Sequence, residues 1–220
     1  MKITLIIPAK NESESLPKVL DELKNFDYET IIILKNNDES TIKSISNYKT
    51  KIVYQDGFGY GDALIKGIDS VKTEYFCIFN ADGSFNPKEI DNMLKKIIEQ
   101  KLDLIFASRY QKNSGSDDDT IVTLIGNYFF SFLGKIFFRL NITDILYTFL
   151  IGKTEEVKKL NLKSKDFRFC VELPIKAKKN NMKMISVSSY ERKRIAGKKK
   201  VNEIKDGLLI LISMIKLFFK

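Results

Sequence analysis

Short apolar runs alternate with segments of helical periodicity in the first half of the chain. The apolar runs are rich in β-branched residues and predict buried strands at 3–7, 30–34, 51–54, 75–79 and 104–107. Between the runs, apolar residues recur at helical spacing, as at Leu16, Val19, Leu20 and Leu23. Strands that alternate with amphipathic helices are typical of a mostly parallel sheet covered by helices, so we expect an α/β fold.

The pattern changes at about residue 110. Residues 111–119 are polar and rich in Gly, Ser and Asp, whereas 121–151 is strongly apolar and aromatic. The apolar segment is interrupted by Asn127, Lys135, Arg139 and Asp144. These interruptions argue against a membrane-spanning helix, which needs about 20 mostly apolar residues. The remaining elements expected are helices at 154–160 and 172–179, a strand at 184–187, a basic loop at 190–201 and a final apolar helix.

The composition narrows the classes of protein. With 220 residues, 44% hydrophobic and 30% charged, the chain is an ordinary globular protein of one domain. The net charge of +9 favours an anionic partner such as nucleic acid, a phosphorylated small molecule or an acidic membrane surface. The absence of His, with two isolated cysteines, argues against a zinc site and against a Ser-His or Cys-His hydrolase. The first apolar stretch is too short for a secretory signal, so we expect a cytoplasmic protein.

Polar segments follow three of the predicted strands, at 8–12, 36–38 and 80–82. Ligands of open α/β sheets bind at the carboxyl ends of the strands, so we expect these segments to converge. Asp82 is placed as a ligand of a divalent cation would be, although such a turn also occurs with nothing bound. A glycine-rich turn at 57–61 follows the third strand, whereas a dinucleotide fingerprint belongs after the first. It predicts a tight strand-to-helix connection or a close approach of backbone to a ligand.

Taken in order, these segments resemble the family 2 glycosyltransferases of GT-A fold. Within that family they are similar to the polyprenyl-phosphate glycosyltransferases related to dolichol-phosphate mannose synthase. Residues 6–12 (IIPAKNE) look like the opening Ile-Pro-Ala-Tyr-Asn-Glu signature, and 57–68 looks like the Gly-x-Gly-x-Ala…Gly-Ile segment. Residues 80–84 (NADGS) occupy the Asp-x-Asp position, and 107–110 (ASRY) looks like Gly-Ser-Arg-Tyr. Later matches lie at 126–127, 143–144, 169, 172 and 190–202, so the resemblance runs nearly from end to end.

The resemblance implies a single GT-A domain over 1–205, with an apolar C-terminal helix over 206–220. Residues 1–110 would form the nucleotide-sugar-binding half and 111–205 the acceptor half. Asp82 would hold Mg²⁺ or Mn²⁺ on the diphosphate and act in catalysis with Arg194. The residues that would bind the nucleotide sugar are Pro8, Ala9, Asn11, Glu12, Asn37, Asp38, Gly61, Asn80, Ala81, Asp82, Arg194 and Lys200. Those that would border the acceptor are Arg109, Asp144 and Glu172.

The reaction that the resemblance implies is inverting transfer of a hexose, of mannose or glucose type, from a GDP- or UDP-sugar to a dolichyl or undecaprenyl phosphate. A lipid phosphate is already an anion near neutral pH, so its attack needs no strong general base. One alternative keeps the fold and donor but uses a saccharide hydroxyl in cell-surface glycan synthesis. Another is an inactive nucleotide-sugar-binding homologue, because Asn80 replaces the family's first metal-site carboxylate. A nucleic-acid-binding protein would explain the charge but none of the motifs, so we expect no nucleic acid partner.

The C-terminal segment predicts contact with a membrane surface. Leu208, Leu209, Ile212, Ile215 and Phe219 share one helical stripe, and a basic loop precedes them. An apolar stripe beside basic residues is typical of an interfacial anchor, and the segment is too short to span. We therefore expect a peripheral protein on the cytoplasmic face of a membrane. The alternative is that the stripe packs on the domain itself. Some members of the resembled branch rely on an integral membrane partner, which leaves such a partner open here.

Overall fold

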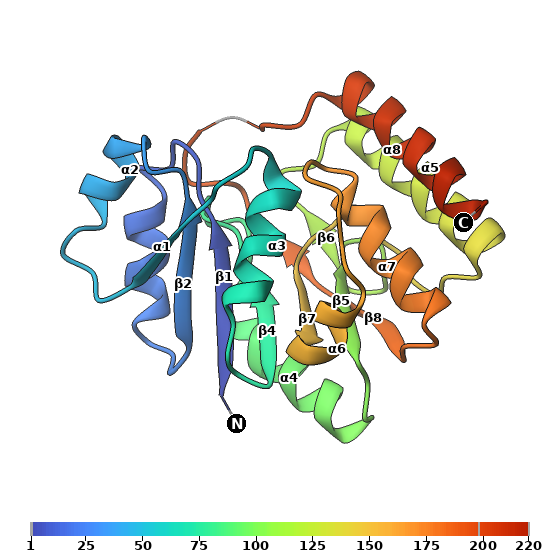
Figure 1. Cartoon of the computed structure of the whole chain (residues 1–220), viewed down its shortest axis with the longest axis horizontal. Helices are drawn as coiled ribbons and strands as arrows, with labels where there is room; N and C mark the ends of the chain where they lie inside the picture. The colour runs from blue at the N-terminus through green and yellow to red at the C-terminus, as the bar shows by residue number, and fades with distance from the viewer. Residues whose placement is uncertain (1, 198, 220) are drawn as a thin grey trace.

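The computed structural model describes residues 2–197 and 199–219, which form a central sheet flanked by helices (Figure 1). The strands of this sheet are β1 (Ile3–Pro8), β2 (Glu29–Leu34), β3 (Lys51–Tyr54), β4 (Tyr75–Ile78), β5 (Leu104–Ser108), β7 (Leu150–Lys153) and β8 (Met184–Ser188). The helices are α1 (Leu16–Leu23), α2 (Glu39–Ser44), α3 (Tyr60–Ser70), α4 (Lys88–Glu99), α5 (Ile121–Phe138), α6 (Thr154–Lys159), α7 (Phe169–Lys179) and α8 (Glu203–Phe218). Two short strands, β6 (Gly115–Ser116) and β9 (Tyr190–Glu191), form a separate ribbon.

The sheet has seven strands in the order β3-β2-β1-β4-β7-β5-β8. All its pairings are parallel except those of β7, which runs antiparallel to β4 and β5. The predicted mostly parallel sheet is therefore confirmed. The strand β7 was not predicted, because its sequence Leu-Ile-Gly-Lys lies at the end of the apolar segment 121–151 and shows no alternation that would separate it from that segment.

The two faces of the sheet bury different residues of the same strands. In β1, Leu5 and Ile7 point into a core shared with α1 and α4, whereas Ile6 points into a core shared with α3, α6 and α7. This alternation follows from the period of two in a strand. Because both faces are covered, the central strands β1, β4 and β5 are buried along most of their length and read as nearly continuous apolar runs. The sheet thus fixes the loops at its carboxyl edge.

The helices α5 and α8 lie side by side outside α7 (Figure 1). Phe130 of α5 and Ile210 and Met214 of α8 form a third apolar cluster with Val171 and Ile175 of α7. The opposite face of α8 is exposed. Of the predicted stripe, Leu208, Ile212 and Ile215 are exposed on α8 and Phe219 is exposed directly after it, whereas Leu209 is partly buried. The helix therefore packs on the domain through one face and presents most of the predicted stripe to the outside.

The helix α5 spans 18 residues and is the one helix, among those that the structure describes, with the length and hydropathy to cross a membrane. Of its residues, 22% are buried. Two of the polar interruptions noted in the sequence lie beyond it, because Arg139 ends the helix in a left-handed conformation and Asp144 follows. Length and composition alone are weak evidence for a span, since α5 also packs on α7 and α8 through Phe130.

The polar segment at 36–38 leads directly into a helix that was not predicted. This short helix, α2, starts at Glu39. The carboxylate of Asp38 accepts a hydrogen bond from the backbone N–H of Thr41 and so caps this helix. The loop between β2 and α2 is consequently short and fixed at both ends.

Candidate active site

The carboxyl ends of β1, β2 and β4 lie side by side, because Ile6 pairs with Ile31 of β2 and with Ile78 of β4. Pro8 ends β1, and the N–H of Ala9 continues the pairing by donating to the carbonyl of Ile33 at 2.8 Å. The three polar segments predicted to converge therefore do start from one edge of the sheet.

The first two segments are tied together by Asp38. One of its oxygens, Oδ2, accepts from the N–H of Asn11 at 2.7 Å, and the N–H of Glu12 donates to the hydroxyl of Thr41 at 2.9 Å. Burial favours a higher pKa for Asp38, but the hydrogen bonds from Asn11 and Thr41 outweigh it and lower the pKa. Asn37, beside Asp38, is exposed. The carboxylate of Asp38 thus holds the backbone of the first segment.

The third segment contains Asn80, Ala81 and Asp82. Asp82 Oδ1 accepts two hydrogen bonds from Ser84, from its N–H at 3.0 Å and its hydroxyl at 2.7 Å. Ala81 is buried, and the side-chain amide of Asn80 lies 3.5 Å from the Ser84 hydroxyl. Gly83 has a φ of +81°. A Cβ there would lie 2.4 Å from Ile195, so the turn requires glycine. This tight turn fixes Asp82 Oδ1 and leaves Oδ2 for another partner.

The segment that follows β9 runs along this turn. The N–H of Arg192 donates to the carbonyl of Ser84 and that of Ile195 to the carbonyl of Asp82, both at 2.8 Å. These bonds bring Arg194 Nη1 to within 3.6 Å of Asp82 Oδ2. The two residues predicted to act in catalysis are therefore neighbours, although they lie 112 positions apart in the sequence. The backbone hydrogen bonds between the two segments bring them together.

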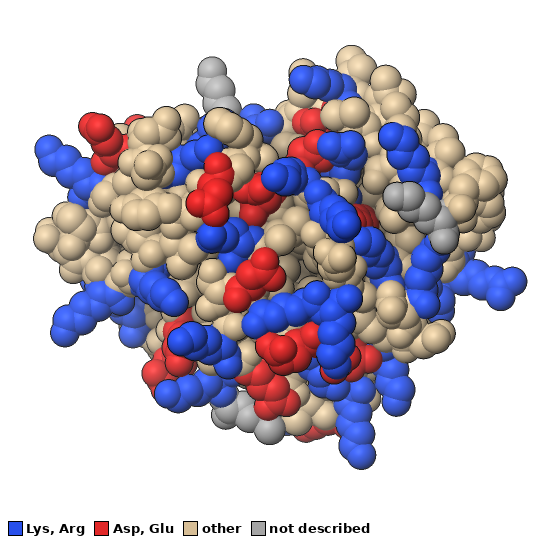
Figure 2. Space-filling model, in the orientation of Figure 1, with Lys and Arg blue, Asp and Glu red and all other residues tan. Residues whose placement is uncertain are grey.

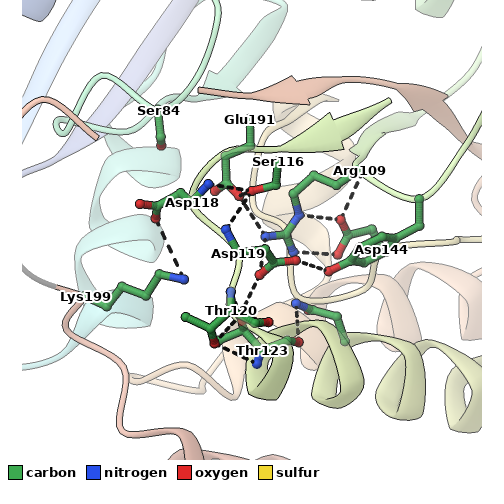
Figure 3. A network of polar contacts seen from close by, with 12 residues as sticks. Ser84, Arg109, Ser116, Asp118, Asp119, Thr120, Thr123, Asp144, Glu191 and Lys199 are labelled. Atoms are coloured by element: carbon green, nitrogen blue, oxygen red, sulfur yellow. Dashed lines mark hydrogen bonds and ion pairs between the residues drawn. The ribbon is translucent and has the colours of Figure 1, made fainter. Parts of the chain in front are cut away.

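Asp118 binds Arg194 more closely than Asp82 does. Arg194 Nη2 donates to Asp118 Oδ2 at 2.7 Å, and Nε lies 3.2 Å from both carboxylate oxygens. Lys199 Nζ lies 3.8 Å from the same carboxylate (Figure 3). Asp118 was not among the predicted site residues. Its only signal was the acidic run at 117–119 within a polar loop.

Lys200 lies over the first segment. Its ammonium group contacts Glu12 Oε1 and the carbonyl of Lys10, while the Ser15 hydroxyl donates to Glu12 Oε2 at 2.6 Å. The basic loop therefore bridges the first segment through Lys200 and the third through Arg194. Lys198 of the predicted basic loop lies outside the described residues.

The glycine-rich turn packs on protein backbone. A Cβ on Gly61 would lie 2.2 Å from the carbonyl oxygen of Ser164, and one on Gly59 would lie 2.1 Å from that of Lys165. Glu172 holds the same loop, since its carboxylate accepts from the N–H of Ser164 at 2.6 Å and pairs with Lys176 at 2.8 Å. Gly61 and Glu172 thus share one structural task, which is to fix residues 163–166 against the start of α3.

Arg109 is the centre of a buried network (Figure 3). Its guanidinium binds Asp144 through Nε at 2.8 Å and Nη2 at 3.0 Å, and Nη1 donates to Glu191 at 3.0 Å. Burial raises the pKa of Asp144 and of Glu191, against the effect of the Arg109 charge. Arg109 and Asp144 thereby join the end of β5 to the segment between α5 and β7.

A divalent cation fits this edge of the sheet through one carboxylate. Among residues 2–197 and 199–219, no group of three or more His, Cys, Asp or Glu side chains is arranged as a metal site. Asp82 Oδ2, however, accepts no hydrogen bond from Ser84, which uses the other oxygen. Mg²⁺ is commonly held by one or two carboxylates together with substrate phosphates and water. Asp82 suits a cation shared with a diphosphate.

Comparisons with known proteins give the family to which the chain belongs. The model of glycosyl transferase family 2 matches residues 4–160. The UDP-N-acetylglucosamine–dolichyl-phosphate N-acetylglucosaminyltransferase of Methanococcus voltae is 25% identical over 204 residues, which cover 82% of this chain and 81% of that protein. An uncharacterized glycosyltransferase of Mycobacterium tuberculosis is 22% identical over 210 residues, covering 96% of this chain and 94% of that protein.

Solved structures show the same fold. Glucosyl-3-phosphoglycerate synthase of Mycobacterium tuberculosis superposes with a TM-score of 0.76 at 12% identity, over 98% of this chain and 80% of that one. Mannosyl-3-phosphoglycerate synthase of Rubrobacter xylanophilus gives a TM-score of 0.72 at 12% identity, over 99% and 72% of the two chains. The first enzyme has also been crystallised with Mn²⁺, UDP and glucosyl-3-phosphoglycerate. The predicted GT-A fold and family resemblance are confirmed: the chain belongs to glycosyl transferase family 2 and is a nucleotide-sugar-dependent glycosyltransferase.

Proposed function

We propose that this enzyme transfers a hexose from a nucleotide-diphosphate sugar to a polyprenyl phosphate at the cytoplasmic face of a membrane, with inversion at the anomeric carbon. The observation that carries the proposal is that α5 and α8 both start beside the candidate site and both expose apolar side chains. Thr120 caps α5 directly after Asp118 and Asp119, and Asn202 caps α8 directly after the basic loop. An acceptor with a polar head and a long apolar tail suits a polar site that adjoins an apolar surface.

The donor half of the proposal rests on the loops at the carboxyl edge of the sheet. The segment at 8–12, with Asn37 and Asp38, would hold the base and ribose. Arg194 and Lys200 would bind the diphosphate, because guanidinium and ammonium groups form charge-assisted hydrogen bonds with phosphate. A divalent cation on Asp82 would neutralise charge on the leaving nucleoside diphosphate. The Methanococcus relative, which is named for a UDP-sugar donor, supports a nucleotide donor of this class.

The choice of a phosphate over a hydroxyl acceptor depends on which carboxylates of the site are free to take a proton from the acceptor. A hydroxyl acceptor needs a general base. Asp144 is fully buried and bound twice by Arg109, and Asp38 accepts hydrogen bonds from backbone N–H groups. A lipid phosphate oxygen is already anionic. It would attack the anomeric carbon as the bond to the diphosphate breaks and the nucleoside diphosphate leaves, with no proton transferred. The dolichyl-phosphate acceptor named for the Methanococcus relative supports this choice.

The surface over α5 and α8 supports contact with a membrane. The exposed apolar side chains on these helices are Ile121, Val122, Ile125, Tyr128, Phe129, Phe132, Ile136, Phe137, Ile204, Leu208, Ile212, Ile215, Phe218 and Phe219. Figure 2 shows a mostly uncharged region over these helices, whereas charges of both signs cover much of the rest of that face. Soluble proteins rarely expose a contiguous apolar surface of this kind without a partner. Interfacial helices bury such a face at the boundary of headgroups and acyl chains.

Thermal-shift titration tests the donor site. The protein is titrated with UDP, GDP, CDP and dTDP, each with and without Mn²⁺, because a ligand at a hundred times its dissociation constant stabilises a protein by about 2.7 kcal/mol. We expect one nucleotide to give a shift that Mn²⁺ enhances. Asp82→Ala should remove the enhancement by Mn²⁺, whereas Asp56→Ala, at an exposed position, should retain it. If no nucleotide stabilised the protein, the proposed donor site would be wrong. Nucleotide binding without sugar transfer would instead fit the inactive nucleotide-sugar-binding homologue suggested by Asn80.

A further inference from the structure

The carboxylate of Asp118 lies between two cations of the basic loop. Arg194 binds it through Nη2 at 2.7 Å and through Nε at 3.2 Å to each oxygen, and Lys199 Nζ lies 3.8 Å away. The side chains of Asp118 and Arg194 are 11% and 21% exposed, so this pair is largely shielded from water. Shielding makes the attraction between the two charges stronger than at an open surface.

Asp118 is held in this place by its own loop. The ribbon of β6 and β9 is parallel, with Ser116 opposite Glu191, so the residues that follow each strand also lie beside each other. The hydroxyl of Ser116 accepts from the N–H of Asp118 at 3.1 Å and donates to Glu191 at 2.5 Å. Glu191 in turn binds Arg109 (Figure 3). The hydrogen bonds of Ser116 and Glu191 therefore hold the carboxylate of Asp118 beside the basic loop.

We propose that Asp118 is an internal competitor of the donor's diphosphate, which must displace this carboxylate from Arg194. The inference rests on the proposed function, in which Arg194 binds the diphosphate beside Asp82. A guanidinium binds a carboxylate and a phosphate in the same two-pronged way. Arg194 Nη1 also lies 3.6 Å from Asp82, the residue proposed to share the cation with the diphosphate. Binding of the donor thus exchanges one anion for another at Arg194, and release of the nucleoside diphosphate reverses the exchange.

The competition lowers donor affinity and favours product release. A diphosphate that binds Arg194 must break a shielded, charge-assisted contact and also approach the negative charge of Asp118. Removing that charge while keeping the shape of the side chain should strengthen diphosphate binding, on the order of tenfold in dissociation constant. If Asp118 instead only positioned Arg194 for the ligand, the same change would weaken binding.

Asp118→Asn tests this directly, with Asp118→Ser as a second variant and Asp117→Asn as the matched control. Asp117 lies in the same loop, and Asp117→Asn removes the same charge as Asp118→Asn. Asp117 accepts a hydrogen bond from the hydroxyl of Tyr190, whereas Arg194 binds Asp118. Isothermal titration with inorganic pyrophosphate, UDP and GDP in the presence of Mg²⁺ gives the dissociation constants. We expect tighter binding in both Asp118 variants and an unchanged value in the control.

Hydrogen exchange without any added anion gives a second readout. Amides of 192–197 should exchange faster in the Asp118 variants than in Asp117→Asn, because the loop loses its anchor. Equal exchange, weaker or unchanged anion binding, or no binding of pyrophosphate by any of the proteins would overturn the inference. Failure of the proposed function looks different, because pyrophosphate would still bind, more tightly in the Asp118 variants, while neither nucleotide bound to any of the proteins.

Discussion

Arg109 and Asp144 form a bidentate ion pair, with Nε 2.8 Å from Oδ2 and Nη2 3.0 Å from Oδ1, and Asp144 has no exposed surface. The N–H of Arg109 also donates to Asp144 Oδ2 at 3.1 Å. The pair joins the end of β5 to the segment that enters β7, whose antiparallel insertion separates β4 from β5. It therefore stabilises the part of the fold that carries the proposed acceptor side.

Breaking this pair should strongly destabilise the protein. Asp144→Ala leaves the buried guanidinium of Arg109 without its main partner, which typically costs about 3–5 kcal/mol. Urea-induced unfolding measures the difference in the free energy of unfolding. Asp21→Ala is the control: it removes the exposed pair with Lys24 and should change stability little, because exposed pairs contribute little. Equal effects of the two substitutions would show that the buried network does not stabilise the fold.

The glycine turn at the start of α3 should tolerate no side chain at Gly61. Gly61→Ala places a Cβ 2.2 Å from the carbonyl oxygen of Ser164, so the loop at 163–166 must move and the melting temperature should fall. Gly126→Ala on α5 is the matched change, because a Cβ there meets nothing within 4 Å. Alanine favours a helix over glycine by about 0.5–1 kcal/mol, so Gly126→Ala should raise stability slightly. A Gly61→Ala variant with an unchanged melting temperature would contradict this packing of Gly61 against Ser164.

Arg194 should account for a large share of diphosphate affinity. Arg194→Ala removes a charge-assisted hydrogen bond donor and should weaken binding of the nucleoside diphosphate by about 1.5–3 kcal/mol, measured by calorimetric titration. Lys193→Ala removes one positive charge from the preceding position, which is exposed, and serves as the control. If Arg194→Ala and Lys193→Ala bound the nucleoside diphosphate with the same affinity, a cation other than Arg194 would have to bind the diphosphate.

The exposed face of α5 should determine membrane binding. Ile125→Glu and Phe132→Glu place charges in the apolar surface and should reduce sedimentation of the protein with vesicles that contain anionic lipid. Phe58→Glu adds the same charge at an exposed aromatic position outside α5 and α8 and should leave sedimentation unchanged. Binding that persisted in the α5 variants would assign the membrane contact to another surface.

The local patterns in the sequence predicted most strands and helices correctly. The runs at 3–7 and 104–107 correspond to β1 and β5, because strands buried on both faces read as continuous apolar segments. The strand β7 escaped prediction for a physical reason. Leu150 and Ile151 form a strand because they pair with β4 and β5, which are distant in the sequence. The pattern of residues around them does not distinguish a strand from the apolar segment that precedes it.

The candidate site was predictable where its residues follow strands. Asp82 and Asp38 lie in the loops that follow β4 and β2, and the edge of a parallel sheet brings such loops together. Asp118 was not predictable, because its contact with Arg194 depends on the two-residue strands β6 and β9, which are too short to give a periodic pattern. The ion pair between Arg109 and Asp144 was not predictable either, since the spacing of residues in the sequence does not reveal which charges are buried together.

The most direct test of the proposed reaction supplies labelled GDP-mannose or UDP-glucose as the donor and undecaprenyl or dolichyl phosphate as the acceptor, in detergent with Mg²⁺ or Mn²⁺. Label should pass from one of these donors into the organic phase. That transfer should require the divalent cation and be lost in Asp82→Ala and when the lipid phosphate is replaced by the corresponding free alcohol. Label that reached saccharide acceptors but never the lipid phosphate would contradict the proposed acceptor.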